Sequence, residues 1–195
     1  MRRMPLRLTP PLKRRLTRRA QAMIGRALPY FPELRGKSIT VGYTRKHLGS
    51  ASIRYRKGLI VELVIRLRVR RLTYQTIGHE LTHLVQGLAR GDRRAVSSLH
   101  GENIPSGEKQ CDLWTLARDQ IFCDDAPTYL RLPRIMRERW PDYAEGVRAL
   151  CRAAIEKRKS HRRYIRWLEE EIKKLAPASA AEKTAPAQLS LPFPA

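Results

Sequence analysis

The chain has 195 residues, 42% of them hydrophobic, which is enough for a folded domain with a buried core. Forty Lys and Arg against 18 Asp and Glu give a formal net charge of +22. Such an excess repels itself unless a polyanion neutralises it, so nucleic acid is the expected partner; a generally basic protein without a polyanion is the alternative. No apolar stretch approaches the roughly 20 residues of a membrane span, and no secretory signal is recognisable, so we expect no membrane association.

The three cysteines, Cys111, Cys123 and Cys151, are odd in number and have no C-x-x-C spacing. This pattern is typical of reduced thiols that mostly serve packing in a protein of the cytoplasm. Together with the positive charge, it predicts a cytoplasmic, nucleoid-associated protein.

Residues 10–28 have the pattern of an amphipathic helix that Pro29 ends. Its apolar positions recur at helical spacing: Leu12, Leu16, Ala20, Met23, Ile24 and Ala27. Basic residues crowd the remaining surface: Lys13, Arg14, Arg15, Arg18 and Arg19. We expect one side of this helix to pack on the core and the basic side to be available to phosphates.

A strand region follows between residues 38 and 69. Short strands are predicted over 38–43 and 51–56. A third is predicted over 59–69, where β-branched residues dominate and Glu62 and Arg66 indicate one solvent-exposed face. We expect these three strands to be antiparallel.

Two helices are predicted next. Thr73 is the expected N-cap of a helix that runs to about Gln86 and is closed by Gly87. Ser106 is the expected cap of a helix over about 107–120.

One long helix, or two, is predicted over residues 141–175. Its most basic stretch, 157–163, supplies further candidate nucleic-acid contacts: Lys157, Arg158, Lys159, Arg162 and Arg163. The chain after residue 175 is rich in Ala and Pro and is expected to be disordered.

The strongest chemical signal is the pentapeptide His-Glu-Leu-Thr-His at 79–83. Residues four apart share a helix face, so His79 and His83 can present both imidazoles to one zinc ion. Glu80 lies beside them, where its carboxylate can accept a proton from a zinc-bound water. The spacing and the apolar residues around it favour a zinc site over two surface histidines.

A third ligand has two candidates. Glu108 opens the next predicted helix, and Asp112 follows four residues later, where it can accept the second ring N–H of a ligand histidine. His100, in the intervening loop, is the rival ligand. We prefer Glu108 because it brings this supporting carboxylate at a helical interval.

The pentapeptide followed by Glu108-x-x-x-Asp112 resembles the gluzincin clan of metallopeptidases, especially the minigluzincins and the ImmA/IrrE-type proteins. The resemblance covers roughly residues 59–120. It implies zinc ligands at His79, His83 and Glu108, a general base at Glu80 and a histidine partner at Asp112.

The strand-then-helix order also resembles the SprT-like proteases, whose third ligand is the histidine of a His-Gly pair. His100-Gly101 matches that pair. The aromatic residue usual shortly afterwards is replaced by Asn103 and Ile104, which weakens this choice of ligand.

The resemblance implies an α+β, zincin-like fold, with a sheet of about three antiparallel strands packed on the motif helix. In such folds the strand before that helix is often an edge that pairs with extended substrate, which assigns this role to residues 59–69. Tyr129 and His100 are candidates for stabilising an oxyanion.

Four regions are therefore expected: a basic helix over 1–36, a zincin-like core over 37–136, a basic helical region over 137–175 and a tail over 176–195. The tail ends Gln-Leu-Ser-Leu-Pro-Phe-Pro-Ala and resembles the bacterial sliding-clamp-binding motif. A clamp contact would use its Gln, its two Leu and its Phe: Gln188, Leu189, Leu191 and Phe193.

Three functions are compatible with these features. The first is a zinc peptidase that acts on DNA-associated proteins, as SprT-like proteases digest proteins crosslinked to DNA. The second is a regulatory peptidase that cleaves one repressor, as the ImmA/IrrE resemblance implies. The third is a DNA-binding module with a purely structural zinc ion.

Overall fold

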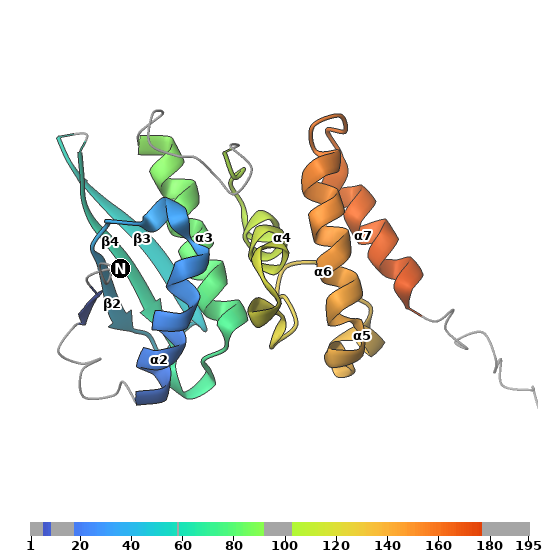
Figure 1. Ribbon diagram of the computed structural model, residues 1–195, viewed down its shortest axis with the longest axis horizontal. Coiled ribbons are helices and arrows are strands. Elements are labelled where there is room, and N and C mark those ends of the chain that lie inside the picture. Colours follow the sequence, from blue (N-terminus) through green and yellow to red (C-terminus); the bar gives the residue numbers. More distant parts are fainter. Residues whose placement is uncertain (1–5, 9–17, 58, 92–102, 177–195) are drawn as a thin grey trace, which may run out of the picture.

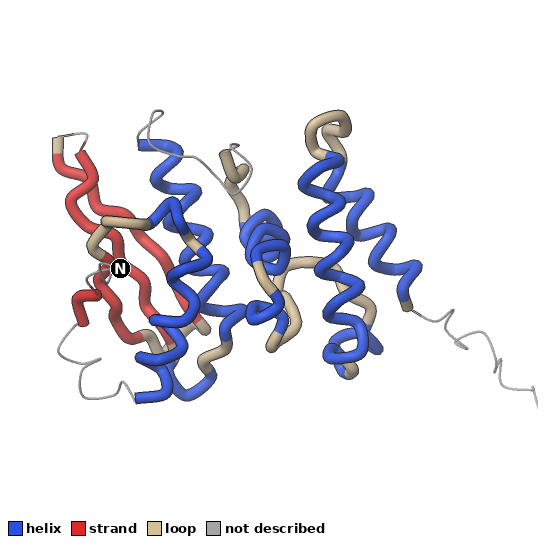
Figure 2. The backbone as a smooth tube through the Cα atoms, viewed as in Figure 1, coloured by secondary structure: helices blue, strands red, loops and turns tan. Residues whose placement is uncertain are grey.

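The computed structural model describes residues 6–8, 18–57, 59–91 and 103–176. Within them the fold is α+β, as predicted, with helices packed in successive layers on a sheet (Figure 1, Figure 2). The sheet has four strands and not about three, because residues 6–8 add a strand that was not predicted. The strands are β1 (Leu6–Leu8), β2 (Ile39–Tyr43), β3 (Gly49–Arg56) and β4 (Leu59–Leu67). The α-helices are α2 (Arg18–Ala27), α3 (Tyr74–Gly91), α4 (Glu108–Arg118), α5 (Arg134–Glu138), α6 (Trp140–Lys157) and α7 (Tyr164–Leu175).

The expectation of a wholly antiparallel sheet is wrong. The strand order is β1-β2-β4-β3; β2 is parallel to both β1 and β4, and only β3 is antiparallel to β4. The reason lies in the loop Thr44–Leu48, which crosses the end of β4 instead of turning back on β2. The loop is held there by Thr44 N–H donating to Leu67 O and by Arg68 N–H donating to Leu48 O.

The strand expected over 59–69 is not an edge. β4 ends at Leu67 and pairs with β2 on one side and β3 on the other, and residues 69–71 form a short 3-10 helix, η3 (Val69–Arg71). Among the described strands, β3 pairs with β4 alone and β1 with β2 alone, so the outer edge of β3 is one of the two edges without a partner strand.

Thr73 is the N-cap of helix α3, as predicted. The Thr73 hydroxyl accepts from Thr76 N–H, and the carboxylate of Asp124 accepts from Tyr74 N–H and Gln75 N–H. These bonds satisfy backbone donors that a helix start leaves unpaired.

The helix does not end at Gly87 but continues to Gly91. Gly87 instead allows close packing on β3, because a Cβ there would lie 2.4 Å from the Ile53 side chain. Helix α4 likewise departs from its prediction, since its N-cap is Gly107, at φ +122°, and not Ser106.

The elements lie side by side in the order sheet, α3, α4, α6 and α7, with α2 packed against α3 (Figure 1). Residues 141–175, predicted as one helix or two, form two. Helices α3 and α4 approach closely at Gly78, where a Cβ would lie 2.5 Å from Thr115 and 2.7 Å from Phe122. This contact fixes the distance between the two helices that carry the predicted site.

Helix α2 confirms the predicted amphipathic pattern over its described residues. The predicted apolar positions Ala20, Met23, Ile24 and Ala27 are buried, whereas Arg18 and Arg19 are exposed. Lys13, Arg14, Arg15, His100 and the tail motif at residues 188–193 lie outside the described residues, and their roles stay predictions. No helix in the described part of the chain is long and apolar enough to cross a membrane.

A buried ion pair joins α4 to the segment after α2. Arg118 Nη2 lies 2.8 Å from Glu33 Oε1, and both side chains are fully buried. The guanidinium also donates to Tyr30 O and lies 4.1 Å from the centre of the Phe31 ring. Removal of one partner would leave the other charge buried and unpaired.

We predict that Glu33→Gln lowers the free energy of unfolding by about 3 kcal/mol or more, because Arg118 then has no counter-charge in the core. Glu138→Gln is the matched control, since it removes the partner of Arg134 in a solvent-exposed pair. Urea unfolding measures both. Equal stability of the two variants would show that the buried pair is not important for the fold.

Candidate metal centre

Helix α3 presents the pentapeptide to a cleft. His79 and His83 lie one turn apart, with ring centroids 4.9 Å apart and the rings inclined at 77°. The cleft has a volume of about 1110 Å³ and lies between α3, the first residues of α4 and the open edge of β3.

Glu108 faces both histidines. Its Oε2 atom lies 2.9 Å from His79 Nε2 and 3.0 Å from His83 Nε2. In a tetrahedral zinc site with bonds near 2.1 Å, nitrogen and oxygen ligands lie about 3.4 Å apart. Movement of the three groups by a few tenths of an ångström would therefore admit an ion. Their side chains are 7% (His79), 25% (His83) and 48% (Glu108) exposed, so one side of the group opens to the cleft.

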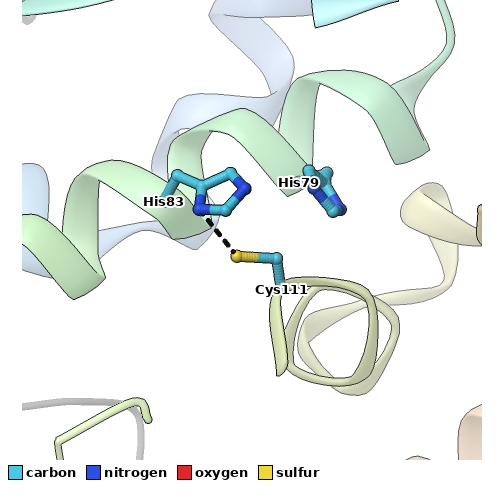
Figure 3. A group of neighbouring side chains, drawn as sticks. All are labelled: His79, His83 and Cys111. Atoms are coloured by element: carbon cyan, nitrogen blue, oxygen red, sulfur yellow. Dashed lines mark hydrogen bonds between the residues drawn. The ribbon is translucent and has the colours of Figure 1, made fainter. Parts of the chain in front are cut away.

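Cys111 offers a second arrangement. One ligand atom each of His79, His83 and Cys111 lies within 4.8 Å of the others, so these residues could also bind a metal ion. The sulfur, however, contacts His83 at Nδ1, at 3.2 Å, and not at the Nε2 atom that faces Glu108 (Figure 3). Burial, with the nearby carboxylates, raises the pKa of the Cys111 thiol well above its usual range and opposes the thiolate that a metal needs.

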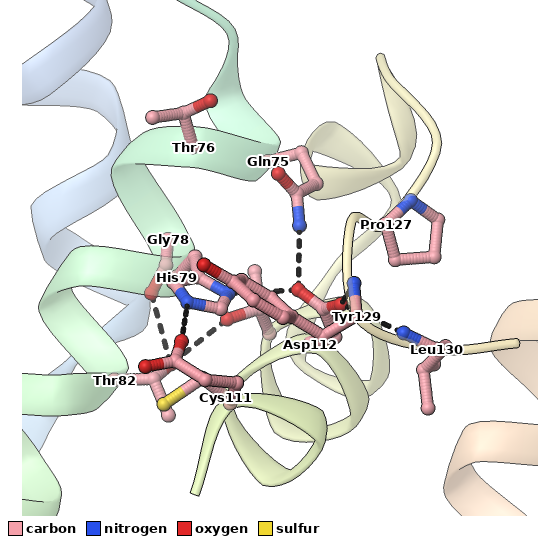
Figure 4. A network of polar contacts seen from close by, with 12 residues as sticks. Gln75, Thr76, Gly78, His79, Thr82, Cys111, Asp112, Pro127, Tyr129 and Leu130 are labelled. Atoms are coloured by element: carbon pink, nitrogen blue, oxygen red, sulfur yellow. Dashed lines mark hydrogen bonds and ion pairs between the residues drawn. The ribbon is translucent and has the colours of Figure 1, made fainter. Parts of the chain in front are cut away.

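Asp112 holds His79 from behind. Its fully buried carboxylate lies 2.7 Å from His79 Nδ1, whose N–H donates to it, and it also accepts from Gln75 Nε2 at 3.0 Å (Figure 4). The backbone N–H groups of Tyr129 and Leu130 donate to its other oxygen. With the proton held on Nδ1, the lone pair of His79 Nε2 is directed at Glu108 and is free to bind a metal.

The same contacts affect the protonation of His79. Burial disfavours the imidazolium, but the hydrogen bond to Asp112 and the negative charges of Asp112 and Glu80 outweigh it and raise the pKa of His79. The site is therefore electrostatically prepared for positive charge, whether a proton or a metal ion carries it.

Gln86 orients His83, the second histidine of the pentapeptide. The pentapeptide motif alone did not identify Gln86 as part of the site. His83 Nδ1–H donates to Gln86 Oε1 at 3.1 Å, while Gln86 Nε2 donates to Pro105 O at 2.6 Å and to Gly107 O at 3.4 Å. The buried amide thus connects His83 to the backbone just before Glu108. Its position three residues after His83, on the same side of the helix, was the available signal.

Glu80 lies on the neighbouring wall of the cleft and is 6% exposed. Burial raises the pKa of its carboxyl to about 7, with His79 opposing the shift and Glu108 adding to it. The side chain rests against Gly49 of β3, where a Cβ would lie 2.5 Å from Glu80 Oε1. A carboxyl with a near-neutral pKa can both accept and return a proton.

Tyr129, an expected oxyanion-stabilising residue, also lines this cleft. Its ring stacks on His79, with centroids 5.3 Å apart and an angle of 24°. Burial and the nearby carboxylates raise the pKa of its hydroxyl, which therefore remains a hydrogen-bond donor.

The structure thus brings six predicted residues together. Asp112 lies behind His79, and the other five line the cleft: His79, Glu80, His83, Glu108 and Tyr129. The basic residues of 157–163 belong to α6 and the α6–α7 loop, and α6 is separated from α3 by α4 (Figure 1). No family model, curated protein or solved structure matches the chain.

The two arrangements make different predictions for the third ligand. We expect Glu108→Ala to lower metal affinity by at least about 10-fold, because its oxygen lies between both Nε2 atoms. We expect Cys111→Ser to retain metal, since the sulfur lies at the other nitrogen of His83. Equilibrium dialysis with elemental analysis measures both. Loss of metal from the Cys111 variant alone would instead favour the sulfur-containing set.

Proposed function

We propose that this chain is a zinc-dependent endopeptidase with His79, His83 and Glu108 as the metal ligands. The single observation that carries the proposal is the convergence of Glu108 Oε2 on both Nε2 atoms, at 2.9 and 3.0 Å, beside a buried Glu80 in an open cleft. Two imidazoles and one carboxylate that leave a position for water are typical of catalytic zinc. A closed structural site would instead use four protein ligands.

Glu80 is the proposed general base. A zinc ion at these ligands would polarise the scissile carbonyl and lower the pKa of a bound water. Glu80 accepts a proton from the attacking water and returns it to the leaving amine, a role that its near-neutral pKa suits. Asp112 and Gln86 keep His79 and His83 oriented during this exchange.

The proposed substrate is an extended peptide that pairs with β3. Its outer edge borders the cleft and has no partner strand among the described residues, so its backbone groups are available to a substrate strand. Gly49 in this strand lies against Glu80, so a peptide paired with this edge would lie next to the proposed general base.

DNA-associated proteins are the proposed substrate class, in the cytoplasm and at the nucleoid. The net charge of +22 supports contact with nucleic acid. The tail residues Gln188, Leu189, Leu191 and Phe193 lie outside the described residues, and their contact with a sliding clamp stays a prediction.

Two substitutions test the chemistry. We expect Glu80→Gln to lower casein cleavage by about 10² to 10⁴-fold while zinc content stays near one per chain, because only the proton acceptor is lost. We expect Gly49→Ala to lower kcat by about 10²-fold, since its Cβ displaces the Glu80 carboxylate. Gly25→Ala is the matched control, because nothing lies within 4 Å of a Cβ there. Undiminished cleavage by Glu80→Gln would refute the mechanism.

A DNA-dependence experiment separates the three candidate functions. The zinc-loaded protein is incubated with a protein crosslinked to DNA and with the same protein free. Faster, metal-dependent degradation of the crosslinked form is expected, since the basic surface holds enzyme and substrate on one polyanion. Cleavage of one partner alone, indifferent to DNA, would favour a regulatory peptidase. DNA binding without cleavage would favour a structural zinc module.

A further inference from the structure

The positive charge of this protein is concentrated before the motif helix. Between residues 18 and 73 there are fourteen Lys and Arg but only two acidic residues, Glu33 and Glu62. Both already form ion pairs: Glu33 is buried against Arg118, and Glu62 pairs with Arg54. This part of the surface therefore has little internal compensation for its charge.

The C-terminal helices differ in this respect. Residues 140–176 contain ten Lys and Arg and six acidic residues. Several of these cations are paired locally, such as Arg166 with Glu170 and Lys174 with Glu171, and Lys157 lies over the Trp167 ring. Exposed pairs of this kind reduce the field that a polyanion would sense.

A hollow with a volume of about 670 Å³ lies within the basic region, between α2 and η3. Three arginines line it: Arg19 from α2, and Arg70 and Arg71 from η3. All three are exposed, and none has a carboxylate partner among the described residues. Asp125 is the one acidic residue of the lining.

The hollow adjoins the metal-site cleft. Leu48 lines both, and the next residue, Gly49, touches Glu80. Exposed Arg45 and Lys46 precede Leu48 in the loop that crosses the end of β4, and neither has a carboxylate partner in the described part of the chain. Unpaired positive charge thus extends from the hollow to the end of the cleft at which β3 begins.

We propose that the hollow formed by Arg19, Arg70 and Arg71 binds the phosphate backbone of nucleic acid. Guanidinium groups match phosphate oxygens in a fork geometry, and several of them on one concave surface suit a rod-like polyanion. An acidic membrane would instead call for several protruding apolar anchors, whereas the hollow has three exposed arginines and one exposed leucine, Leu48. Contacts to phosphates give binding without sequence preference.

This inference deepens the proposed function and rests on it for one point only, that a protein held on the bound nucleic acid reaches the cleft. The hollow and the start of β3 share Leu48, so a polypeptide emerging from the nucleic acid would lie next to the substrate edge. Binding itself does not depend on catalysis.

The test is duplex DNA binding by the full chain carrying Glu80→Gln, measured by fluorescence anisotropy over a salt series. We expect the added pair Arg70→Gln and Arg71→Gln to flatten the dependence of log K on log salt by about 2, since each phosphate contact contributes roughly 0.9. The matched control is Arg134→Gln with Arg166→Gln, which removes equal charge from exposed arginines outside the hollow. Its slope should stay close to that of the parent.

Arg19→Gln, on the opposite wall of the hollow, gives an independent reading if the double variant unfolds, and it should flatten the slope by about 1. Equal losses in the hollow and control variants would overturn the proposal, as would absence of DNA binding by the parent. Binding to phosphatidylserine vesicles that depends on the hollow, without binding to DNA, would assign the surface to membranes. DNA binding through the hollow by a protein that cleaves nothing would contradict the peptidase and leave this inference standing.

Discussion

The buried carboxylate of Asp112 is the interaction on which the site depends. It accepts hydrogen bonds from Gln75 and His79 of α3 and from the backbone of Tyr129 and Leu130, so one side chain of α4 holds three segments together. A buried carboxylate is costly unless it is fully hydrogen-bonded, and these four donors meet that need. The same bonds set the tautomer of His79, so the core and the metal site share one constraint.

Much of the local arrangement could be predicted because it depends on short intervals. The i,i+4 spacing of His79 and His83 and of Glu108 and Asp112 fixes which side chains share a helix face, and both helices are confirmed. The sheet topology could not be predicted in this way. Whether β2 lies beside β4 depends on the path of residues 44–48 across the sheet, which no periodicity encodes.

The residues that support the metal site were not predicted from the sequence for a related reason. Gly49 has no distinctive local pattern, and Gln86 has only its interval of three residues from His83. Both support the site because α3 packs against β3 and against the segment before Glu108. The distribution of charge over the surface also depends on packing between distant segments. The sequence predicts a basic protein, but only the structure shows that Glu33 is buried against Arg118 and that Asp125 is the one acidic residue lining the hollow beside α2. Close packing of distant segments therefore determines both the orientation of the ligands and the free positive surface.

The central claim is a zinc site with two imidazoles, one carboxylate and a position open to water, in which Cys111 takes no part. X-ray absorption spectroscopy of the zinc-loaded protein tests this claim most directly, because it distinguishes sulfur from nitrogen and oxygen neighbours. The account predicts a shell of nitrogen and oxygen at about 2.0–2.2 Å with no sulfur. A sulfur neighbour at about 2.3 Å would contradict it and make Cys111 a ligand.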